Sequence, residues 1–317
     1  MDQYGGPFDY VGWSASLSGD VDGDGCDDVL VGGPQDPVAN ASSGSTSGPG
    51  YAFLVPAAEV NSSCSGSSVY TYYYGEDDGD AAGYSVDFID YNGDGDDELL
   101  IGAPLADSEA GAVYVAEGDE TTFFVALGDA MVTYTGESSD DRAGWSVANA
   151  GDVNDDGYED VIIGAYSNDD GGNNSGSAYL ILGPRSITGS VVDLDDADAQ
   201  ITGASNGDGA GYDVASAGDL NGDDYDDLLI GAWKNDEGGT NAGATFVLYG
   251  PVSGSLGLSS ADALLEGDAA RDLAGAVLAG GHDVNDDGYD DILVGAYYAD
   301  DGGTNSGAAY LILGLGQ

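Results

Sequence analysis

Short apolar runs recur along the chain, and each of them directly follows an acidic loop. Each run has Val, Ile or Leu at its first three positions and ends in Gly followed by Gly or Ala. Such runs are too short for a helix and rich in β-branched residues, so they predict buried strands. A second apolar run follows after a Gly-rich connection, for example at residues 177–182 and 244–249. The first runs lie at residues 29–33, 99–103, 161–165, 228–232 and 292–296.

Two further segments complete the repeated unit. One of them is the fourth strand, which is followed by a Gly, as residues 69–74 and 131–135 are. The other is the first strand of the next unit, which begins after a connection of fixed length. The Gly that opens this connection and the Gly that closes it are eight positions apart in every copy, as Gly75 and Gly83 are. The pattern therefore predicts a unit of four strands in which the acidic loop joins the first strand to the second.

The acidic loops give the repeat its period. Their first residues are 62 to 70 positions apart, which suits a blade of four strands. Four-stranded antiparallel units repeated in this way predict an all-β fold, a β-propeller of five blades that forms a single domain over residues 1–317. The five loops span residues 20–28, 90–98, 152–160, 219–227 and 283–291.

The last unit has no fourth strand in the sequence. It ends after its third strand, at Leu313, whereas residues 2–4 precede a Gly in the way that fourth strands do elsewhere. We therefore expect the N-terminal segment to supply the outer strand and to close the ring, because circular closure protects sheet edges. The alternative is that these five units belong to a larger ring.

The acidic loops have the spacing of a calcium site. Asp or Asn occupies positions 1, 3 and 5 of each loop, and Asp or Glu occupies position 9. Side chains at alternate positions of a tight loop converge, and Ca²⁺ takes about 6 to 8 oxygen ligands. We expect about five Ca²⁺ ions, one in each repeat, with the backbone carbonyl of position 7 and water completing each shell. The expected ligands are Asp20, Asp22, Asp24, Cys26, Asp28, Asp90, Asn92, Asp94, Asp96, Glu98, Asp152, Asn154, Asp156, Tyr158, Asp160, Asp219, Asn221, Asp223, Tyr225, Asp227, Asp283, Asn285, Asp287, Tyr289 and Asp291.

Other interpretations of these loops fit the pattern less well. An EF-hand needs Glu at position 12 and a helix after it, whereas position 12 here is aliphatic and lies within a strand. Mg²⁺ demands a rigid octahedral shell and keeps its waters. A single loop of this kind could be an ordinary turn with solvated charge, but five in register favour a metal site. Position 6 is Gly in four loops, and Asp224 in the fourth must adopt positive φ or a variant turn.

Short motifs also frame the first two strands of each unit. Gly followed by Tyr or Trp opens strand one, at residues 83–84, 144–145 and 211–212. Gly-Ala followed by Pro, Tyr or Trp ends strand two, at residues 102–104, 164–166, 231–233 and 295–297. With these motifs the chain resembles the FG-GAP repeats of the integrin α-chain N-terminal β-propeller along almost its whole length. The resemblance implies calcium in hairpin loops, an extracellular setting and ligand binding on the opposite face. Integrin propellers have seven blades, whereas five units are present here, and all five keep the acidic loop.

The face opposite the acidic loops holds the candidate ligand-binding cations. Connections between strands two and three reach this face, as do those that lead from strand four to the next unit. Arg142, Lys234 and Arg271 fall on it and form a candidate contact for a ligand. Salt bridges to neighbouring Asp residues are the commoner alternative for such cations.

Aromatic residues recur at two places in the unit. Tyr166, Trp233 and Tyr297 follow strand two near the rim, where a protein or glycan ligand could stack on them. Aromatic residues at the head of strand one, such as Trp145 and Tyr212, are instead expected to pack between blades.

The charge of the chain argues against several classes of partner. It has 59 acidic and 4 basic residues among 317, so its formal net charge is -55. This charge repels nucleic acid and anionic lipid, and no apolar stretch is long enough to span a bilayer. His282 and Lys234 are the sole residues of their types, which leaves little for acid–base or Schiff-base chemistry. We therefore expect no enzyme, no nucleic-acid partner and no membrane insertion.

The acidity exceeds what metal binding requires. A near absence of Lys with abundant Asp is typical of halophilic proteins, in which salt screens the self-repulsion, and a calcium-rich marine or cell-wall setting is the alternative. Cys26 and Cys64 emerge on the same face of one unit and could form a disulfide, which suits an oxidising compartment. The first residues lack the features of a signal peptide, so we expect an extracellular or cell-surface protein whose signal peptide has been removed.

Repeat, charge and motifs together predict the function. We expect a non-enzymatic, calcium-binding extracellular β-propeller that mediates adhesion or binds a protein or glycan ligand through the face opposite the calcium loops. Other domains of a larger surface protein are further candidate partners. Two alternatives are an enzyme or enzyme accessory module that acts on polysaccharide, and a purely structural surface-layer or stalk module.

Overall fold

The computed structural model describes residues 10–35, 48–60, 64, 69–118, 122–184 and 189–314. Within these residues the fold is all-β, and the helices are single turns. None of the helices in this described part is long and apolar enough to cross a membrane. The turns are α2 (Ala57–Val60), α3 (Ala106–Glu109), η1 (Leu127–Asp129), η2 (Leu194–Asp196) and η3 (Leu258–Ser260).

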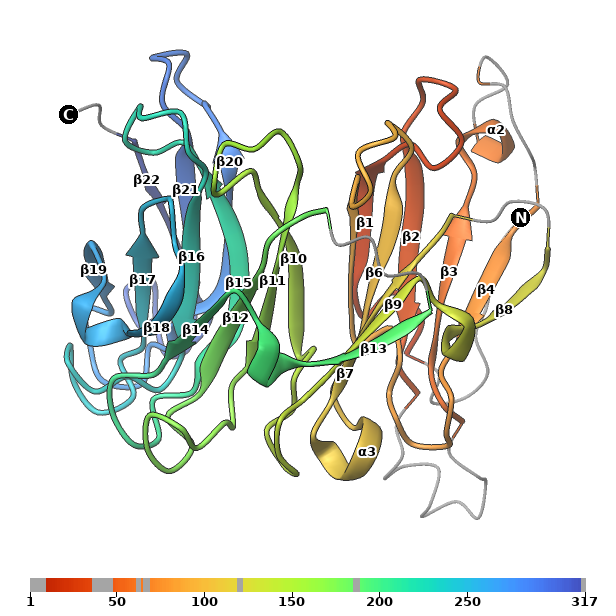
Figure 1. Cartoon of the computed structure of the whole chain (residues 1–317). Helices are drawn as coiled ribbons and strands as arrows, with labels where there is room; N and C mark the ends of the chain where they lie inside the picture. Colours follow the sequence, from red (N-terminus) through yellow and green to blue (C-terminus); the bar gives the residue numbers. More distant parts are fainter. Residues whose placement is uncertain are drawn as a thin grey trace. The chain divides into compact units, whose positions relative to one another are not determined.

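The contacts within the chain define two compact units. The first consists of Met1–Val147 with Pro184–Leu194, and the second of Ala148–Gly183 with Asp195–Gln317. Each unit contains its own sheets, whose strands are labelled in Figure 1.

The first unit contains two sheets. Their strand orders are β1-β2-β3-β4-β8 and β13-β9-β7-β6-β5. Four neighbouring strands of each sheet pair antiparallel and come from one repeat, as the sequence predicts. The strands are β1 (Ala15–Gly19), β2 (Asp28–Gly33), β3 (Tyr51–Val55), β4 (Thr71–Tyr74), β5 (Ser85–Ile89), β6 (Glu98–Ala103), β7 (Ala112–Ala116), β8 (Phe124–Ala126), β9 (Val132–Thr135) and β13 (Ser190–Asp193).

The second unit contains the other three sheets, apart from the first two residues of β10. Their strand orders are β10-β11-β12-β14-β18, β15-β16-β17-β19 and β20-β21-β22. The strands are β10 (Ser146–Gly151), β11 (Asp160–Ala165), β12 (Ser177–Ile181), β14 (Ala199–Thr202), β15 (Ala210–Gly218), β16 (Asp227–Ala232), β17 (Ala244–Leu248), β18 (Gly254–Gly257), β19 (Ala263–Glu266), β20 (Ala274–His282), β21 (Asp291–Ala296) and β22 (Ala308–Ile312).

Three sheets carry a fifth strand that the sequence pattern does not predict. β8, β13 and β18 pair in parallel with β4, β9 and β14, the fourth strands of the preceding repeats. Figure 1 shows β8 beside β4 and β13 beside β9. These added strands have three or four residues and come from the variable connection between strands three and four. Segments this short have too few residues to show a period of two, so they read as loops.

Strands two and three form the cores of the sheets. Every residue of β6, β11 and β16 is buried, and so is every residue of β7, β12 and β17. In the second unit, Ile162 and Leu180 of one sheet share a core cluster with Ile230 and Phe246 of the next. Because a sheet of the same unit packs against each face of the fourth sheet, β16 and β17 carry continuous apolar runs.

The Gly near the end of strand two lets neighbouring sheets approach closely. A Cβ atom added at Gly164 would collide with the carbonyl oxygen of Gly211, and one added at Gly231 would collide with that of Gly275. Each of these carbonyls belongs to a Gly that is the second residue of the first strand of the following sheet. Gly therefore recurs at this position because a side chain would push the two sheets apart.

The last sheet differs from the other four. Among the described residues it has three strands, β20, β21 and β22, and no fourth strand. The expected closing strand, residues 2–4, lies outside the described residues. The closed ring and its number of blades therefore stay predictions, whereas the five sheets of a propeller-like repeat are present.

Candidate functional site

The first acidic loop gathers its carboxylates at one point. Carboxylate oxygens of Asp20, Asp22 and Asp24 lie within 4.8 Å of one another. The Asp20 carboxylate accepts the backbone N–H groups of Asp24 at 3.1 Å and Gly25 at 2.7 Å. The Asp24 carboxylate accepts the backbone N–H of Cys26 at 2.9 Å. These bonds curl the backbone around the carboxylates at positions 1, 3 and 5.

The other four loops repeat this backbone cradle. In each of them the carboxylate at position 1 accepts the N–H groups of positions 5 and 6 at 2.7–3.1 Å. The carboxylate at position 5 accepts the N–H of position 7 at 3.1–3.2 Å. Position 6 has positive φ throughout, and Asp224 adopts it with a φ of 72°. The loops therefore share one backbone conformation around the position-1 and position-5 carboxylates.

The carboxylate at position 9 ties each loop to the strands beside it. In the third loop, Asp160 accepts the backbone N–H of Val153 at 2.9 Å and that of Gly183, beyond β12, at 2.8 Å. The matching bond to position 2 recurs in every other loop. This carboxylate is buried in all five loops, as Asp28, Glu98, Asp160, Asp227 and Asp291.

Burial disfavours the ionised form of these position-9 carboxylates. Desolvation raises the pKa of Asp160 and Asp227 to about 7 and that of Glu98 to about 8. Repulsion by the carboxylates at positions 1 and 5 of the same loop raises these pKa values further. A cation held in the cradle would oppose both effects, because an opposite charge nearby favours the ionised form.

Several buried oxygen atoms of the loops have no hydrogen-bond partner within the described part of the chain. They are Asp24 Oδ2, Asn154 Oδ1 and Asn221 Oδ1, at positions 5, 3 and 3 of their loops. A buried polar atom without a partner costs about 1–3 kcal/mol. A hard cation that takes oxygen ligands would satisfy these atoms, so the residues present fit Ca²⁺. The complete ligand set, position 7 included, stays a prediction.

A disulfide bond joins Cys26 and Cys64, whose Cα atoms lie 6.1 Å apart. It connects position 7 of the first loop to the segment between strands three and four of the same repeat. The structure thereby confirms a pairing that the sequence left open. Disulfide bonds form and persist in oxidising compartments.

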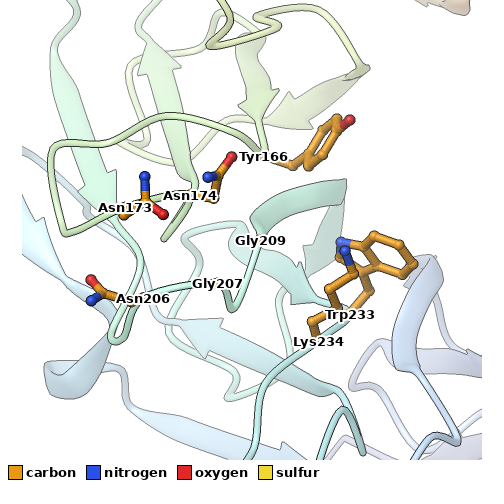
Figure 2. Close-up of a pocket in the computed structure, with 8 residues that line it drawn as sticks. All are labelled: Tyr166, Asn173, Asn174, Asn206, Gly207, Gly209, Trp233 and Lys234. Carbon is orange, nitrogen blue, oxygen red and sulfur yellow. The ribbon is translucent and has the colours of Figure 1, made fainter.

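A pocket of about 480 Å³ opens in the second unit, on the connections opposite the acidic loops. The β11–β12 connection, the β14–β15 connection and the segment after β16 contribute its walls (Figure 2). Figure 2 shows the side-chain amides on one side and the Trp and Tyr rings on the other. Its lining includes Tyr166, Asn173, Asn174, Asn206, Trp233 and Lys234.

The Trp233 ring lines this pocket but already has partners. Tyr212 stacks on it with ring centroids 4.4 Å apart, and the Lys234 ammonium lies 4.1 Å from the ring centroid. The indole Nε1 is buried without a hydrogen-bond partner among the described residues. It faces Gly209, where an added Cβ atom would lie 2.7 Å away. The Trp233 ring is therefore already engaged by Tyr212 and Lys234.

The three candidate cations have different surroundings. Arg142 forms a salt bridge with Glu109 at 2.6 Å in the first unit. This agrees with the alternative that such cations pair with neighbouring acidic residues and do not bind a ligand. Lys234 and Arg271 line one hollow of about 640 Å³ in the second unit. Tyr297 lies beside Tyr298, with ring centroids 4.8 Å apart. The structure thus brings Trp233 together with Lys234 and Arg271, whereas Arg142 is engaged by Glu109.

A recurring buried Asp on this face is absent from the sequence-based candidates. It lies five residues after the Gly that opens the fixed connection. In the second unit, the Asp208 carbonyl accepts the Lys234 N–H at 3.1 Å, and its carboxylate accepts the Asn235 side-chain N–H at 2.9 Å. Burial raises the pKa of Asp208. Its fixed spacing was the available signal, hidden by the abundance of Asp. The four residues are Asp80, Asp141, Asp208 and Asp272.

Comparison with known proteins identifies the repeat. The FG-GAP repeat family matches residues 11–51, 82–116, 143–181 and 274–312. The chain is an FG-GAP repeat protein. The matches leave out the fourth repeat, but its strands β15, β16 and β17 pair in the same order as their counterparts in the fifth repeat.

Integrin α chains are similar to most of this FG-GAP repeat protein. Integrin alpha pat-2 of Caenorhabditis elegans is 32% identical over 231 residues, which cover 70% of this chain and 18% of that one. Integrin alpha-PS2 of Drosophila melanogaster is 29% identical, with 69% and 15% covered, and integrin alpha-V of Gallus gallus is 30% identical, with 69% and 20% covered. The chain thus spans a fifth or less of these relatives. The V. cholerae biofilm matrix protein Bap1 matches with a TM-score of 0.31 and 15% identity, covering 84% of this chain and 40% of that one, which is too low to carry an argument.

Proposed function

We propose that this FG-GAP repeat protein is a non-enzymatic, calcium-binding β-propeller module that mediates adhesion at a cell surface or in a secreted protein. The observation that carries the proposal is the shared cradle of the five acidic loops, with buried oxygen atoms that lack partners among the described residues. The similarity to integrin α chains and the Cys26–Cys64 disulfide support an extracellular setting. The scarcity of His and Lys supports a binding function over a catalytic one.

In each repeat, Ca²⁺ bound to the acidic loop would stabilise the connection between the first and second strands. The carboxylates at positions 1, 3 and 5 would hold the ion, and bound Ca²⁺ would supply the positive charge that offsets their repulsion. In four of the loops the position-9 carboxylate already holds the backbone of position 2 and the chain beyond strand three. With the charge balanced, this buried group can stay ionised and keep both hydrogen bonds. The large excess of acidic residues beyond these sites supports a halophilic or calcium-rich setting.

We place the ligand site of this module at the pocket beside Trp233. Its amides at Asn173 and Asn206 and the Lys234 ammonium can all bond to hydroxyl or carbonyl oxygens. A pocket with a few convergent polar groups beside aromatic rings suits a protein loop or a glycan.

Calcium binding is tested by thermal melts in Ca²⁺ and in EDTA at constant ionic strength, together with titration calorimetry. We expect Ca²⁺ to raise the melting temperature and Asp156→Asn to remove about one site, because it alters a single cradle. Asp129→Asn is the matched control, since it removes an exposed carboxylate outside the loops. Identical melting with and without Ca²⁺ would refute the proposal.

The ligand site is tested on arrays of glycans and of extracellular matrix proteins, with the same ligands checked for turnover. Asn206→Ala and Lys234→Ala should weaken binding, whereas Arg142→Ala, which removes a cation held by Glu109 in the first unit, should not. Turnover of a bound polysaccharide would instead favour the enzymatic alternative.

A further inference from the structure

An apolar groove runs beside the outer edge of β22 in the second unit. Two hollows of about 310 and 140 Å³ meet there and share Leu265 and Ile312. Ala263 and Leu265 of β19 form one wall, and Tyr310 and Ile312 of β22 form the other. We call this feature the β22 groove.

The β22 groove lies where the other sheets have their fourth strand. In the fourth sheet, β19 pairs antiparallel with β17, and the third sheet repeats this pairing with β14 and β12. Within the described chain, β22 pairs with β21 alone. An edge strand of this kind is a template for another strand.

The filled sheets identify the backbone groups that a strand would use. The Gly267 N–H donates to the carbonyl of Gly243 at 2.8 Å, and the Asp262 N–H donates to that of Val247 at 3.0 Å. The third sheet has the same two bonds, so they belong to the repeat. At the matching positions beside the groove lie the carbonyls of Gly307 and Leu311.

We propose that the β22 groove binds an extended strand of a partner protein, antiparallel to β22, with apolar side chains at alternate positions and basic residues at its ends. This interaction surface goes beyond the ligand pocket of the proposed function. It would work by β-augmentation, in which main-chain hydrogen bonds give affinity and alternate side chains give specificity.

The fourth strands of other sheets define the side chains that fit. In β9 and β14 buried and half-buried residues alternate, with Val132 and Tyr134 buried in one and Ala199 and Ile201 in the other. The intervening residues are Thr or Gln. A matching partner strand has this alternation and lacks Pro, which cannot donate to the ladder.

Charge complementarity favours a basic strand from another protein. Glu266 and Asp268 line one end of the groove, and the Tyr310 hydroxyl donates to the Asp301 carboxylate at 3.3 Å. This chain carries 4 basic residues against 59 acidic ones, so a segment of its own or of a second copy would add like charge. Residues 2–4, which the sequence pattern assigns to this place, include Asp2 and no basic residue.

The test uses the whole chain with Ca²⁺ and a fluorescent peptide that copies residues 132–136 between Lys residues. We expect saturable binding, weakened roughly tenfold when Asp replaces the flanking Lys, with a difference that shrinks as salt rises. A version with Pro in place of the central Tyr should not bind. Failure of the Lys-flanked peptide to bind would overturn the proposal.

Two variants of neighbouring residues locate the binding surface. Ile312→Arg places a charge in the groove and should abolish peptide binding, whereas Leu311→Arg places the same charge on the other face of β22 and should preserve it. Melts in Ca²⁺ check that both variants fold. Hydrogen exchange of the β22 amides that point away from β21 is a second measurement on the unaltered chain, and we expect these amides to be protected only with peptide. Protection without peptide would overturn the proposal, and native mass spectrometry would then distinguish a second copy from the chain's own N-terminal segment.

Discussion

The fourth and fifth sheets have closely similar strands, but their surroundings differ. Leu229 and Val247 of the fourth sheet are 0% and 3% exposed, whereas Leu293 and Leu311 at the same positions of the fifth are 43% and 54% exposed. Both pairs face each other across the strands in the same register. Within the second unit the fifth sheet packs against Leu229 and Val247, and no described sheet of this unit packs in that way against Leu293 and Leu311.

This comparison shows that the apolar run does not by itself determine burial. The run at residues 292–296 predicts a buried strand as the other four runs do, and in β21 part of that prediction is wrong, because Leu293 is exposed. In the second unit, β16 is buried on both faces because the fifth sheet covers its outer face. The β22 groove is open for a different reason, because no fourth strand pairs with β22 among the described residues.

The largest expected effect comes from truncating the equivalent Leu residues. Leu229→Ala should lower the free energy of unfolding by about 3 kcal/mol, because it leaves a cavity between two sheets. Leu293→Ala should cost less than about 1 kcal/mol, because water already reaches that side chain. Urea unfolding in Ca²⁺ measures both. Equal losses would show that a partner or another part of the chain covers the fifth sheet in solution.

The second prediction concerns pH in the absence of metal. The pKa of buried Asp227 is raised to about 7 in the folded protein, so protonation at that site favours folding. The contribution of this protonation to the free energy of unfolding is fully present below the pKa of Asp in the unfolded chain, about 4, and is lost as pH rises through about 7. In EDTA we therefore expect lower melting temperatures at pH 8 than at pH 5.

Two controls sharpen this pH prediction. Asp227→Asn should reduce the difference in melting temperature between pH 5 and pH 8, because Asn does not ionise. Excess Ca²⁺ should remove or reverse it, because the cation favours the ionised carboxylates. A metal-free protein that is more stable at pH 8 would contradict the burial argument.

The sequence predicts the repeated parts of the fold well because they depend on local pattern. The acidic loops, the second and third strands and the positive φ of Asp224 all follow from residue spacing. The parallel strands β8, β13 and β18 depend on a neighbouring repeat, which three or four residues cannot specify. The engagement of Trp233 by Tyr212 and Lys234 likewise depends on residues brought together by the fold.

The third prediction uses the Gly of strand two. Gly231→Ala should cost about 2 kcal/mol, because the new methyl group would meet the Gly275 carbonyl of the next sheet. At Gly295 the nearest atom to such a methyl group is Val277 Cβ at 3.2 Å, within the same sheet. Gly295→Ala should change the stability by less than about 0.5 kcal/mol. The urea midpoints of the two variants in Ca²⁺ measure this difference. A large loss of stability in Gly295→Ala would contradict an open outer face of the fifth sheet.

The smallest expected effect exchanges position 6 between the fourth and fifth acidic loops. Asp224 has a φ of 72° and Gly288 a φ of 91°, and both donate their N–H to the position-1 carboxylate, at 3.0 and 2.7 Å. Asp224→Gly should stabilise the protein by about 0.5 kcal/mol, and Gly288→Asp should destabilise it by about 1 kcal/mol, because Gly adopts positive φ without strain.

Both of these variants keep the backbone hydrogen bond, so their difference reports the conformational strain. Asp224→Asn removes the same charge as Asp224→Gly and keeps a Cβ atom, which separates strain from repulsion within the loop. Unfolding in saturating Ca²⁺ is the measurement, since the carboxylates are then neutralised and charge contributes least. If Asp224→Asn stabilised the protein as much as Asp224→Gly, repulsion and not backbone strain would distinguish the fourth loop from the fifth.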